Sequence, residues 1–406
     1  MLMTSPLAAQ LNLPAGQVRL PPVGDTIGDV TDTIGDTLDD TDSIVERKAQ
    51  QLLRARERSL SRLLRRNRDL IERDARGELA RRGEIIAQDL TEAELALLQQ
   101  ARFRLIARET IEGLDFSITR LGTPQGLDLA EAQQAAAEIA PNANISADNL
   151  HFQAGTMEPV KTMVPTMVAM QSATPINIEV GIIDGAPGAA TRTLGEKGFA
   201  SGAPKPSDHG SAIASLLWDA GIRRIRVADV YGSDPAGGNA LAIAKALGWL
   251  TARGSKVVTI SLVGPRNRLV ERAVQSARLK GIVVVAAVGN DGPAAPPPYP
   301  ASYPGVVAIT GVDRRERALI EAGRALNLDY AAPGADVYGL NVKGKRKRLR
   351  GTSFATPLAA ARIAAAMERG GNWRAQLDAE ARDLGTKGPD KIYGRGLVCA
   401  ECGRKK

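Results

Sequence analysis

The chain has 406 residues, enough for one large domain or for two to three smaller ones. Apolar residues make up 44% and charged residues 24%, a balance that excludes disorder of the whole chain and permits a large buried core. The longest apolar run, 281–289, is too short to span a membrane. Aromatic residues, at 3%, argue against a stacking surface for single-stranded nucleic acid. Only two histidines, His151 and His209, could supply imidazole chemistry.

The net charge of +8 is concentrated in one segment. Residues 47–82 hold 13 Lys or Arg and five Asp or Glu, whereas residues 24–42 hold seven aspartates and no base. Leucine and isoleucine recur through the basic segment at heptad-like spacing, which predicts an Arg-rich amphipathic helix over 44–82. Nucleic-acid binding by this segment is the less favoured interpretation. The preceding residues, 1–43, form an acidic low-complexity segment that contains DTIGD twice.

The first residues give an ambiguous signal for location. Residues 1–12 contain no Lys or Arg and no apolar run typical of a signal peptide, so no complete signal peptide is expected. However, PLAAQ at 6–10 resembles the small-residue end of one. A secreted or periplasmic protein is therefore the first hypothesis, and a cytoplasmic one is the alternative.

Residues 83–153 carry the alternation of strand and helix patterns that is typical of a small ferredoxin-like α+β domain. Thr91 is followed three residues later by Glu94, which predicts a capping box at the start of the first helix. Residues 154–176 hold three prolines and four methionines without a clear period, and they are expected to form a linker. Strands are expected at 84–90, 103–110, 114–121 and 144–152, and helices at 91–101 and 126–140.

From residue 177 to residue 398 the pattern changes. Short apolar strands such as IEVGIID, KVVTISL and GIVVVAAVG alternate with helical patterns such as NALAIAKALGWLTARG. This alternation predicts a parallel sheet covered by helices on both faces, that is, a three-layer α/β domain. Functional residues of such sheets lie just past the carboxyl ends of the strands.

Four residues occupy such boundary positions, each near a glycine: Asp184, His209, Asn290 and Ser353. A serine hydroxyl becomes a strong nucleophile only when a base removes its proton, and an imidazole that titrates near neutral pH can be that base. A carboxylate can orient the imidazole and stabilise its charged form. An asparagine amide and a backbone N–H at a helix N-terminus can stabilise the oxyanion that forms when a carbonyl is attacked.

The segments around these residues, GIIDGAPG, DHGSAIASLL, AAVGNDGP and GTSFATP, resemble the four signature segments of subtilisin-like serine proteases. The resemblance covers 177–398, whose end, ARDLGTKGPDKIYGRGLV, also resembles the close of a subtilase domain. It implies an endopeptidase that cleaves polypeptides through an acyl-enzyme intermediate, with Asp184, His209 and Ser353 as catalytic triad and Asn290 in the oxyanion hole. It also implies substrate-binding walls that contain Ser261, Leu262, Val263, Gly264, Ala287 and Gly289.

The sequence departs from the family pattern in several places. Gly185 and Ala186 follow Asp184 where the family usually has Thr or Ser and then Gly. Val263 stands where subtilisins usually have glycine, so we expect a narrowed specificity pocket that prefers small side chains. Asp291 lies near the expected floor of that pocket. The region is short for the family and loops that hold calcium elsewhere are expected to be trimmed, so no metal or cofactor is expected.

By element order and position, 83–153 resembles a subtilase propeptide. The resemblance implies a precursor whose own prodomain is an intramolecular inhibitor, with a cut within 153–176. The alternative is a protease-like scaffold that has lost turnover and acts through its Arg-rich helix, but the complete set of catalytic residue types argues against it. His151 is expected to be structural.

The two cysteines, Cys399 and Cys402, begin a basic tail over 399–406. A lone pair at this spacing is weak evidence for zinc. Free thiols and a small disulfide are the other two alternatives.

Overall fold

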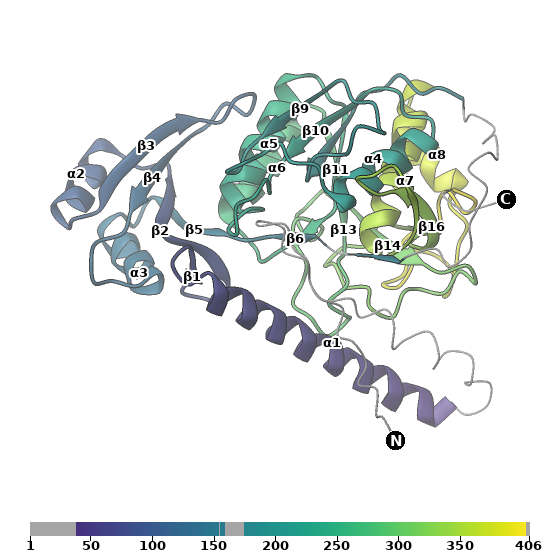
Figure 1. Cartoon of the computed structure of the whole chain (residues 1–406), viewed down its shortest axis with the longest axis horizontal. Coiled ribbons are helices and arrows are strands. Elements are labelled where there is room, and N and C mark those ends of the chain that lie inside the picture. Colours follow the sequence, from purple (N-terminus) through teal and green to yellow (C-terminus); the bar gives the residue numbers. More distant parts are fainter. Residues whose placement is uncertain (1–37, 154, 159–173, 403–406) are drawn as a thin grey trace.

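The computed structural model describes residues 38–153, 155–158 and 174–402, and Figure 1 shows their arrangement. A small α+β domain lies at one end of the molecule and a large α/β domain at the other, and the long helix α1 (Leu38–Arg66) runs along one side. The acidic segment predicted for 1–43 and the PLAAQ sequence fall almost entirely outside the described residues. In the described ranges no helix combines the length and hydropathy needed to cross a membrane.

The predicted extent of the Arg-rich helix, 44–82, is wrong at both ends, because α1 begins at Leu38 and stops well before residue 82. α1 ends at Arg66, and the chain continues into β1 (Ile71–Arg73) and β2 (Leu79–Gln88), which pair antiparallel. A turn that includes Gly77, with φ +79°, joins the two strands. Ile71 and Leu79 match the heptad spacing, but they are buried with Leu60 in a cluster between helix and sheet. Their burial therefore comes from strand packing, not from continuation of the helix.

The small domain has the predicted ferredoxin-like order of elements. Its sheet runs β5-β2-β4-β3 with antiparallel pairing throughout. The predicted capping box is present, since Thr91 Oγ1 accepts from the Glu94 N–H and the Glu94 carboxylate accepts from the Thr91 N–H. The remaining elements of this domain are α2 (Glu92–Gln100), β3 (Arg104–Thr110), β4 (Ser117–Gly122), α3 (Leu129–Ile139) and β5 (Asn144–Asn149).

The large domain contains the predicted parallel sheet. Its seven strands run in the order β15-β14-β13-β11-β8-β10-β9, and all neighbours pair parallel. Strands β9 and β10 lie on one side of β8, and the strands from β11 onward lie on its other side. An α/β sheet typically forms its site at such a switch in strand order. The strands are β8 (Val180–Asp184), β9 (Gly195–Gly198), β10 (Ile225–Asp229), β11 (Val257–Ile260), β13 (Val283–Ala287), β14 (Val307–Val312) and β15 (Tyr330–Pro333).

Helices cover both faces of this sheet, as Figure 1 shows. α4 (Asp208–Asp219) and α7 (Thr352–Glu368) share one hydrophobic core with the sheet, and α8 (Trp373–Glu380) packs on α7. α5 (Ala240–Ala252) and α6 (Arg268–Leu279) form the core on the opposite face. Burial of apolar surface on both faces explains why the strands are apolar throughout instead of alternating.

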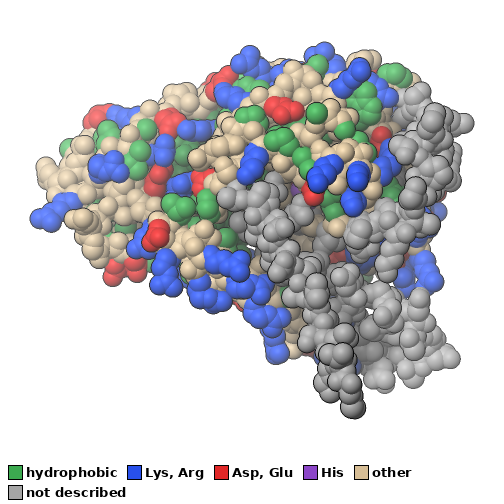
Figure 2. Space-filling view, in the orientation of Figure 1, with side chains coloured by type: hydrophobic (Ala, Val, Ile, Leu, Met, Phe, Trp, Pro, Cys, Tyr) green, Lys and Arg blue, Asp and Glu red, His purple; other side chains and the backbone are tan. Residues whose placement is uncertain are grey.

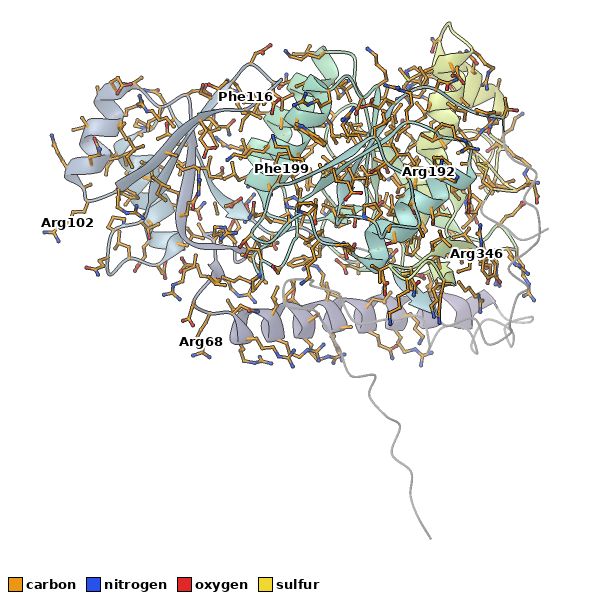
Figure 3. All side chains as sticks on the ribbon, turned by 45° about the horizontal axis from the view of Figure 1, so that its top comes forward. Arg68, Arg102, Phe116, Arg192, Phe199 and Arg346 are labelled. Carbon is orange, nitrogen blue, oxygen red and sulfur yellow. A yellow bond between two sulfur atoms is a disulfide. The ribbon has the colours of Figure 1, made fainter. Side chains whose placement is uncertain are left out.

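The small domain packs on α5 and α6 through the face of its sheet that carries Ile86 and Ile118. Phe116 lies at this junction, where Figure 3 labels it, with the Arg272 guanidinium 4.8 Å from its ring centroid. The Asp148 carboxylate accepts a 2.8 Å hydrogen bond from the Leu241 N–H in the first turn of α5. Polar contacts at a helix N-terminus thus add to the apolar contact between the domains.

Cys399 and Cys402 form a disulfide, so the small disulfide is the one of the three alternatives that describes the structure. Both residues pack against the core that contains α7. The expected basic tail therefore begins with two residues that are tied to the large domain. Residues 403–406 lie outside the described residues.

Candidate active site

Asp184 and His209 form a buried pair. Asp184 is the last residue of β8, and His209 is the second residue of α4. His209 Nδ1 lies 2.8 Å from Asp184 Oδ2 and 3.0 Å from Oδ1. Their exposed fractions are 3% for His209 and 0% for Asp184. The expected contact between these two residues is confirmed, and it leaves Nε2 as the ring nitrogen that does not face the carboxylate.

Two glycines allow α4 to start close enough for this pair. A Cβ on Gly210 would lie 2.0 Å from the carbonyl oxygen of Gly185, and a Cβ on Gly185 would lie 2.5 Å from Ser207 Oγ. Ser207 caps α4, since its Oγ accepts a 2.9 Å hydrogen bond from the Gly210 N–H. Gly185, which departs from the family pattern, therefore leaves room for the Ser207 cap, because a larger side chain there would push α4 away from β8.

Ser353 lies in the first turn of α7 and is fully buried. Its hydroxyl donates a 3.1 Å hydrogen bond to the carbonyl oxygen of Ser261. His209 Nε2 is buried without a hydrogen-bond partner among the described residues. The centroid of the His209 ring lies 5.4 Å from the centroid of the Phe354 ring. Phe354 follows Ser353, so the imidazole lies beside the start of α7. In this state the serine hydroxyl therefore points to Ser261 and not to the imidazole.

Asn290 follows β13 and contacts the start of α7. Its Oδ1 accepts a 3.0 Å hydrogen bond from the Thr352 N–H. A Cβ on Gly351, whose φ is +136°, would lie 2.5 Å from Asn290 Nδ2. Only glycine suits this backbone conformation and this close approach. The Asn290 side-chain amide and the Ser353 N–H therefore both lie at the N-terminal end of α7, where the helix dipole favours a negative charge.

The residues predicted to line the substrate cleft form two facing segments. On one side, β12 (Leu262–Val263) is flanked by Ser261 and Gly264. On the other side are Ala287, at the end of β13, and Gly289. A Cβ on Gly289 would lie 2.9 Å from Val263 Cγ2, so the valine side chain extends across to the opposite segment.

A segment of the chain itself pairs with strands on both sides of Ser353. β6 (Phe152–Gln153) pairs antiparallel with β12, with Gln153 opposite Leu262. β7 (Thr156–Glu158) pairs antiparallel with β17 (Arg346–Arg350), which also pairs with β16 (Ala335–Leu340). The linker predicted for 154–176 is therefore wrong for 156–158, where a strand is found. The predictions for 154 and for 159–173 lie outside the described residues.

Two further features of this segment escaped the sequence analysis. Gln153 Nε2 donates a 2.7 Å hydrogen bond to Asp184 Oδ1, so a residue of the small domain reaches the buried acid. A Cβ on Gly155 would lie 2.7 Å from the Phe354 ring, so the backbone there contacts the start of α7. A glutamine and a glycine have no distinctive pattern, and nothing in the sequence indicated either contact.

Helix α1 covers the loop that follows Asn290. Arg56 Nε lies 3.1 Å from Asp291 Oδ2, and a Cβ on Gly292 would lie 3.0 Å from a Leu52 methyl carbon. Burial raises the pKa of Asp291, and the Arg56 charge opposes that shift. Other Lys and Arg side chains gather over the outer surface of α1 in Figure 2, and Arg68 lies just past its end in Figure 3. Arg56 of the predicted charged helix thus faces the loop that follows Asn290.

Buried His151 adjoins the cleft wall but not the Asp184–His209 pair. A Cβ on Gly264 would lie 2.5 Å from its ring, and burial lowers the pKa of His151 to about 4. Its main chain exchanges hydrogen bonds with the large domain, to the Gly238 carbonyl and from the Tyr231 hydroxyl. These contacts fit the structural role expected for it.

In the described part of the chain, no group of three or more His, Cys, Asp or Glu could hold a metal ion.

Comparisons with known proteins agree with this geometry. The model of the subtilase family matches residues 195–396. Subtilisin DY of Bacillus licheniformis is 30% identical over 253 residues, which cover 55% of this chain and 90% of the relative. Thermitase of Thermoactinomyces vulgaris is 32% identical over 196 residues, which cover 48% of this chain and 67% of the relative.

A solved structure shares the fold over more of the chain. Fervidolysin from Fervidobacterium pennivorans, a keratinolytic enzyme related to subtilisin, superposes with a TM-score of 0.65 at 16% identity. The superposition covers 80% of this chain and 61% of fervidolysin. The fold, the family match and the identity to subtilisins lead to one conclusion: the chain belongs to the subtilase family and is a subtilisin-like serine endopeptidase.

Proposed function

We propose that Ser353, His209 and Asp184 form the catalytic triad of this protease. The supporting observation is the buried contact of His209 Nδ1 with both oxygens of Asp184, because it leaves Nε2 as the base. Ser353 Oγ attacks the carbonyl carbon of the scissile bond while Nε2 takes its proton. His209 then gives that proton to the leaving amine, and an acyl-enzyme ester forms on Ser353. A water molecule, deprotonated by His209 in turn, hydrolyses the ester and restores the serine.

The tetrahedral intermediate of each half-reaction carries an oxyanion. We assign its stabilisation to Asn290 Nδ2 and to the Ser353 N–H. The assignment is supported by the hydrogen bond from Thr352 N–H to Asn290 Oδ1, which fixes the amide plane and leaves Nδ2 as the donor beside Gly351. Fixed donors of this kind act most strongly in the transition state.

The protease is further proposed to be made as a precursor that its N-terminal part blocks. Support comes from β6 and β7, which add the chain's own segment to strands on both sides of Ser353. Main-chain pairing of this kind is a recurrent way to bind a peptide at a sheet edge. It is also supported by the Ser353 hydroxyl, which is bonded to Ser261 and thus turned away from its proposed base.

That last observation also favours the competing function, a scaffold without turnover. The two are separated by a fluorophosphonate probe, which reacts covalently with an activated serine. We expect labelling of the full chain after processing and none in the Ser353→Ala variant. A folded, processed protein that does not react would support the scaffold and contradict the proposed triad.

A secreted or periplasmic location is proposed from the Cys399–Cys402 disulfide, since such bonds persist in oxidising compartments. Mass analysis of protein taken directly from its producing cells, with thiols blocked at lysis, tests the proposal. Two alkylated thiols would contradict it.

A further inference from the structure

We infer that Glu321 is a positioning residue for the proposed oxyanion hole, where it fixes the spacing of the two segments that carry the donors. The inference rests on the proposed function. The Asn290 amide belongs to the segment after β13, whereas the Ser353 N–H belongs to the first turn of α7. Donors from two separate segments are effective when their spacing is fixed before the oxyanion forms, because preorganised donors need no rearrangement during the reaction.

The main chain around Glu321 holds the segment that carries Asn290. The Glu321 carbonyl accepts a 2.9 Å hydrogen bond from the Gly292 N–H, and the Gly323 N–H donates a 2.9 Å hydrogen bond to the Gly289 carbonyl. One of these bonds lies before Asn290 in the chain and the other lies after it. The segment that contains Glu321 therefore fixes Asn290 from both sides.

The side chain of Glu321 holds the segment that leads into α7. Arg350 Nη2 donates a 2.9 Å hydrogen bond to Glu321 Oε2, and Arg350 Nε lies 2.8 Å from Glu321 Oε1. Arg350 is followed by Gly351, the N-cap of α7, whose backbone adjoins the Asn290 amide. The ion pair therefore fixes the chain three residues before Ser353.

These contacts form a ring around the proposed oxyanion hole. From Asn290 the ring runs through Gly292 to Glu321, and the ion pair joins Glu321 to Arg350 at the start of α7. The ring is completed by the Thr352 N–H, which donates a 3.0 Å hydrogen bond to Asn290 Oδ1. Glu321 contacts one segment through its main chain and the other through its side chain. A change of its side chain therefore alters the spacing of the two donors without removing either.

The ion pair is partly desolvated, which makes it a strong constraint. The Glu321 side chain is 6% exposed and the Arg350 side chain is 24% exposed. Water competes poorly for such a pair, and removal of one partner leaves the other charge without compensation. In Glu321→Gln the guanidinium keeps its charge and loses the opposite one. We therefore expect Arg350 to turn toward solvent and the start of α7 to lose its fixed position.

A second ion pair in the same domain supplies a matched control. The Glu179 side chain is also 6% exposed, and Arg226 Nε lies 2.8 Å from Glu179 Oε1. Glu179 precedes the first residue of β8, whereas Asp184 is the last residue of that strand. The control pair therefore lies at the opposite edge of the sheet from the proposed triad. Glu179→Gln repeats the exchange at equal burial and away from the proposed oxyanion hole.

The test measures kcat and KM of the active protein on one p-nitroanilide peptide that the wild type hydrolyses. We expect Glu321→Gln to lower kcat about 10-fold and to change KM by less than about twofold, because the donors act mainly in the transition state. Arg350→Gln should have a similar effect, and the double variant should lose no more than either single variant, since both changes remove the same pair. Glu179→Gln should leave kcat unchanged.

A second cycle of variants shows whether Glu321 acts through the oxyanion hole. Asn290→Ala removes the side-chain donor and the contact that completes the ring. In that background, Glu321→Gln should lower kcat by less than about twofold, because the spacing that it disturbs no longer matters. An effect on the general stability of the fold would instead add in full. Thermal unfolding should show similar melting temperatures for Glu321→Gln and Glu179→Gln.

The outcomes separate the inference from the proposed function. Equal losses of kcat in Glu321→Gln and Glu179→Gln, or full additivity with Asn290→Ala, would overturn the inference and leave the triad in place. A raised KM at unchanged kcat would also overturn it, because the residue would then serve substrate binding. If Glu321→Gln does not fold, Arg350→Gln, which alters the more exposed partner, decides by the same criteria. A folded wild type that neither turns over substrate nor reacts with the fluorophosphonate probe would overturn the triad and the inference together.

Discussion

Gln153 and His209 approach the same carboxylate oxygen. Gln153 Nε2 lies 2.7 Å from Asp184 Oδ1, and His209 Nδ1 lies 3.0 Å from it. A side chain of the small domain is therefore bonded directly to the acid that orients the proposed base. The N-terminal part of the chain thus reaches the Asp184–His209 pair as well as β12 and β17.

Gln153→Ala should weaken the hold of the cleaved N-terminal part on the protease. A hydrogen bond to a charged group is worth roughly 1.5–3 kcal/mol, so we expect roughly 10- to 100-fold faster recovery of activity after processing. The measurement is the time course of peptide hydrolysis by the processed chain. Gln134→Ala, on the exposed face of α3, is the matched control. An unchanged time course would mean that the Gln153 bond adds nothing to inhibition.

Asn290→Asp tests the oxyanion hole, because it keeps an oxygen for the Thr352 N–H and replaces the donor. We expect turnover to fall by about 10²- to 10³-fold, a range taken from removal of one such donor in subtilisin. KM should change much less, since the donor acts mainly in the transition state. Asn290→Ala should show a similar loss of turnover. If kcat stays near normal while KM rises, the side chain binds substrate and has another role.

Val263→Gly should widen the specificity pocket. The wild-type side chain reaches Gly289, so its removal should let large aromatic residues precede the cut. Small changes in pocket volume alter discrimination by about 10- to 200-fold. The ratio of kcat/KM for matched peptides with Phe or Ala before the scissile bond measures the effect, with Val263→Ala expected to be intermediate. An unchanged ratio would show that the pocket lies elsewhere.

His151 should make inhibition sensitive to acid. Burial lowers its pKa to about 4 in the intact arrangement, and an exposed imidazole titrates near about 6.5. The bound state therefore takes up fewer protons than the released one. The contribution of His151 to the affinity between the processed parts should be full above about pH 6.5 and should fall as the pH drops toward 4, by up to about two orders of magnitude. Burial raises the pKa of Asp148 to about 7, and this carboxyl group strengthens the affinity as the pH falls from about 7 to about 4. The His151 contribution is therefore measured as a difference from a variant that keeps Asp148.

The control for this dependence is His151→Phe, which keeps a ring against Gly264 but cannot titrate. Relative to this variant, the wild type should release its N-terminal part progressively faster as the pH falls below about 6.5. Size-exclusion chromatography of the processed protein at a series of pH values follows the release. An acid response equal to that of the wild type would assign it to other groups.

Arg56→Ala should loosen α1 from the large domain. Arg56 and Asp291 are 14% and 18% exposed at their side chains, so their pair is partly desolvated and its loss leaves a buried carboxylate. We expect roughly 5- to 10-fold faster release of the N-terminal part. Arg58→Ala, at an exposed position of the same helix, should have no effect. Equal effects of both changes would point to net charge and not to the pair.

The sequence could indicate candidate site residues because the constraints around them are local. Gly210 and Gly351 are needed where a helix start meets a neighbouring backbone or amide, and such needs leave a fixed pattern around His209 and Ser353. The end of α1 could not be predicted, since Ile71 and Leu79 fit a heptad as well as they fit buried strands. β7 could not be predicted either, because a three-residue strand has no period and its pairing depends on β17, far along the chain.

The pairing of β7 with β17 has a consequence for activation. A cut between β6 and β7, within the range 153–176 expected for processing, would separate β6 from the protease half but would leave β7 covalently joined to it. Departure of the small domain and α1 would therefore uncover only the half of the cleft that binds residues before the scissile bond. The new amino terminus would still occupy the other half. Full access for a protein substrate would thus require two successive steps, the release of the small domain with α1 and then the separation of β7 from β17. The second step depends on how stable the β7–β17 pairing is.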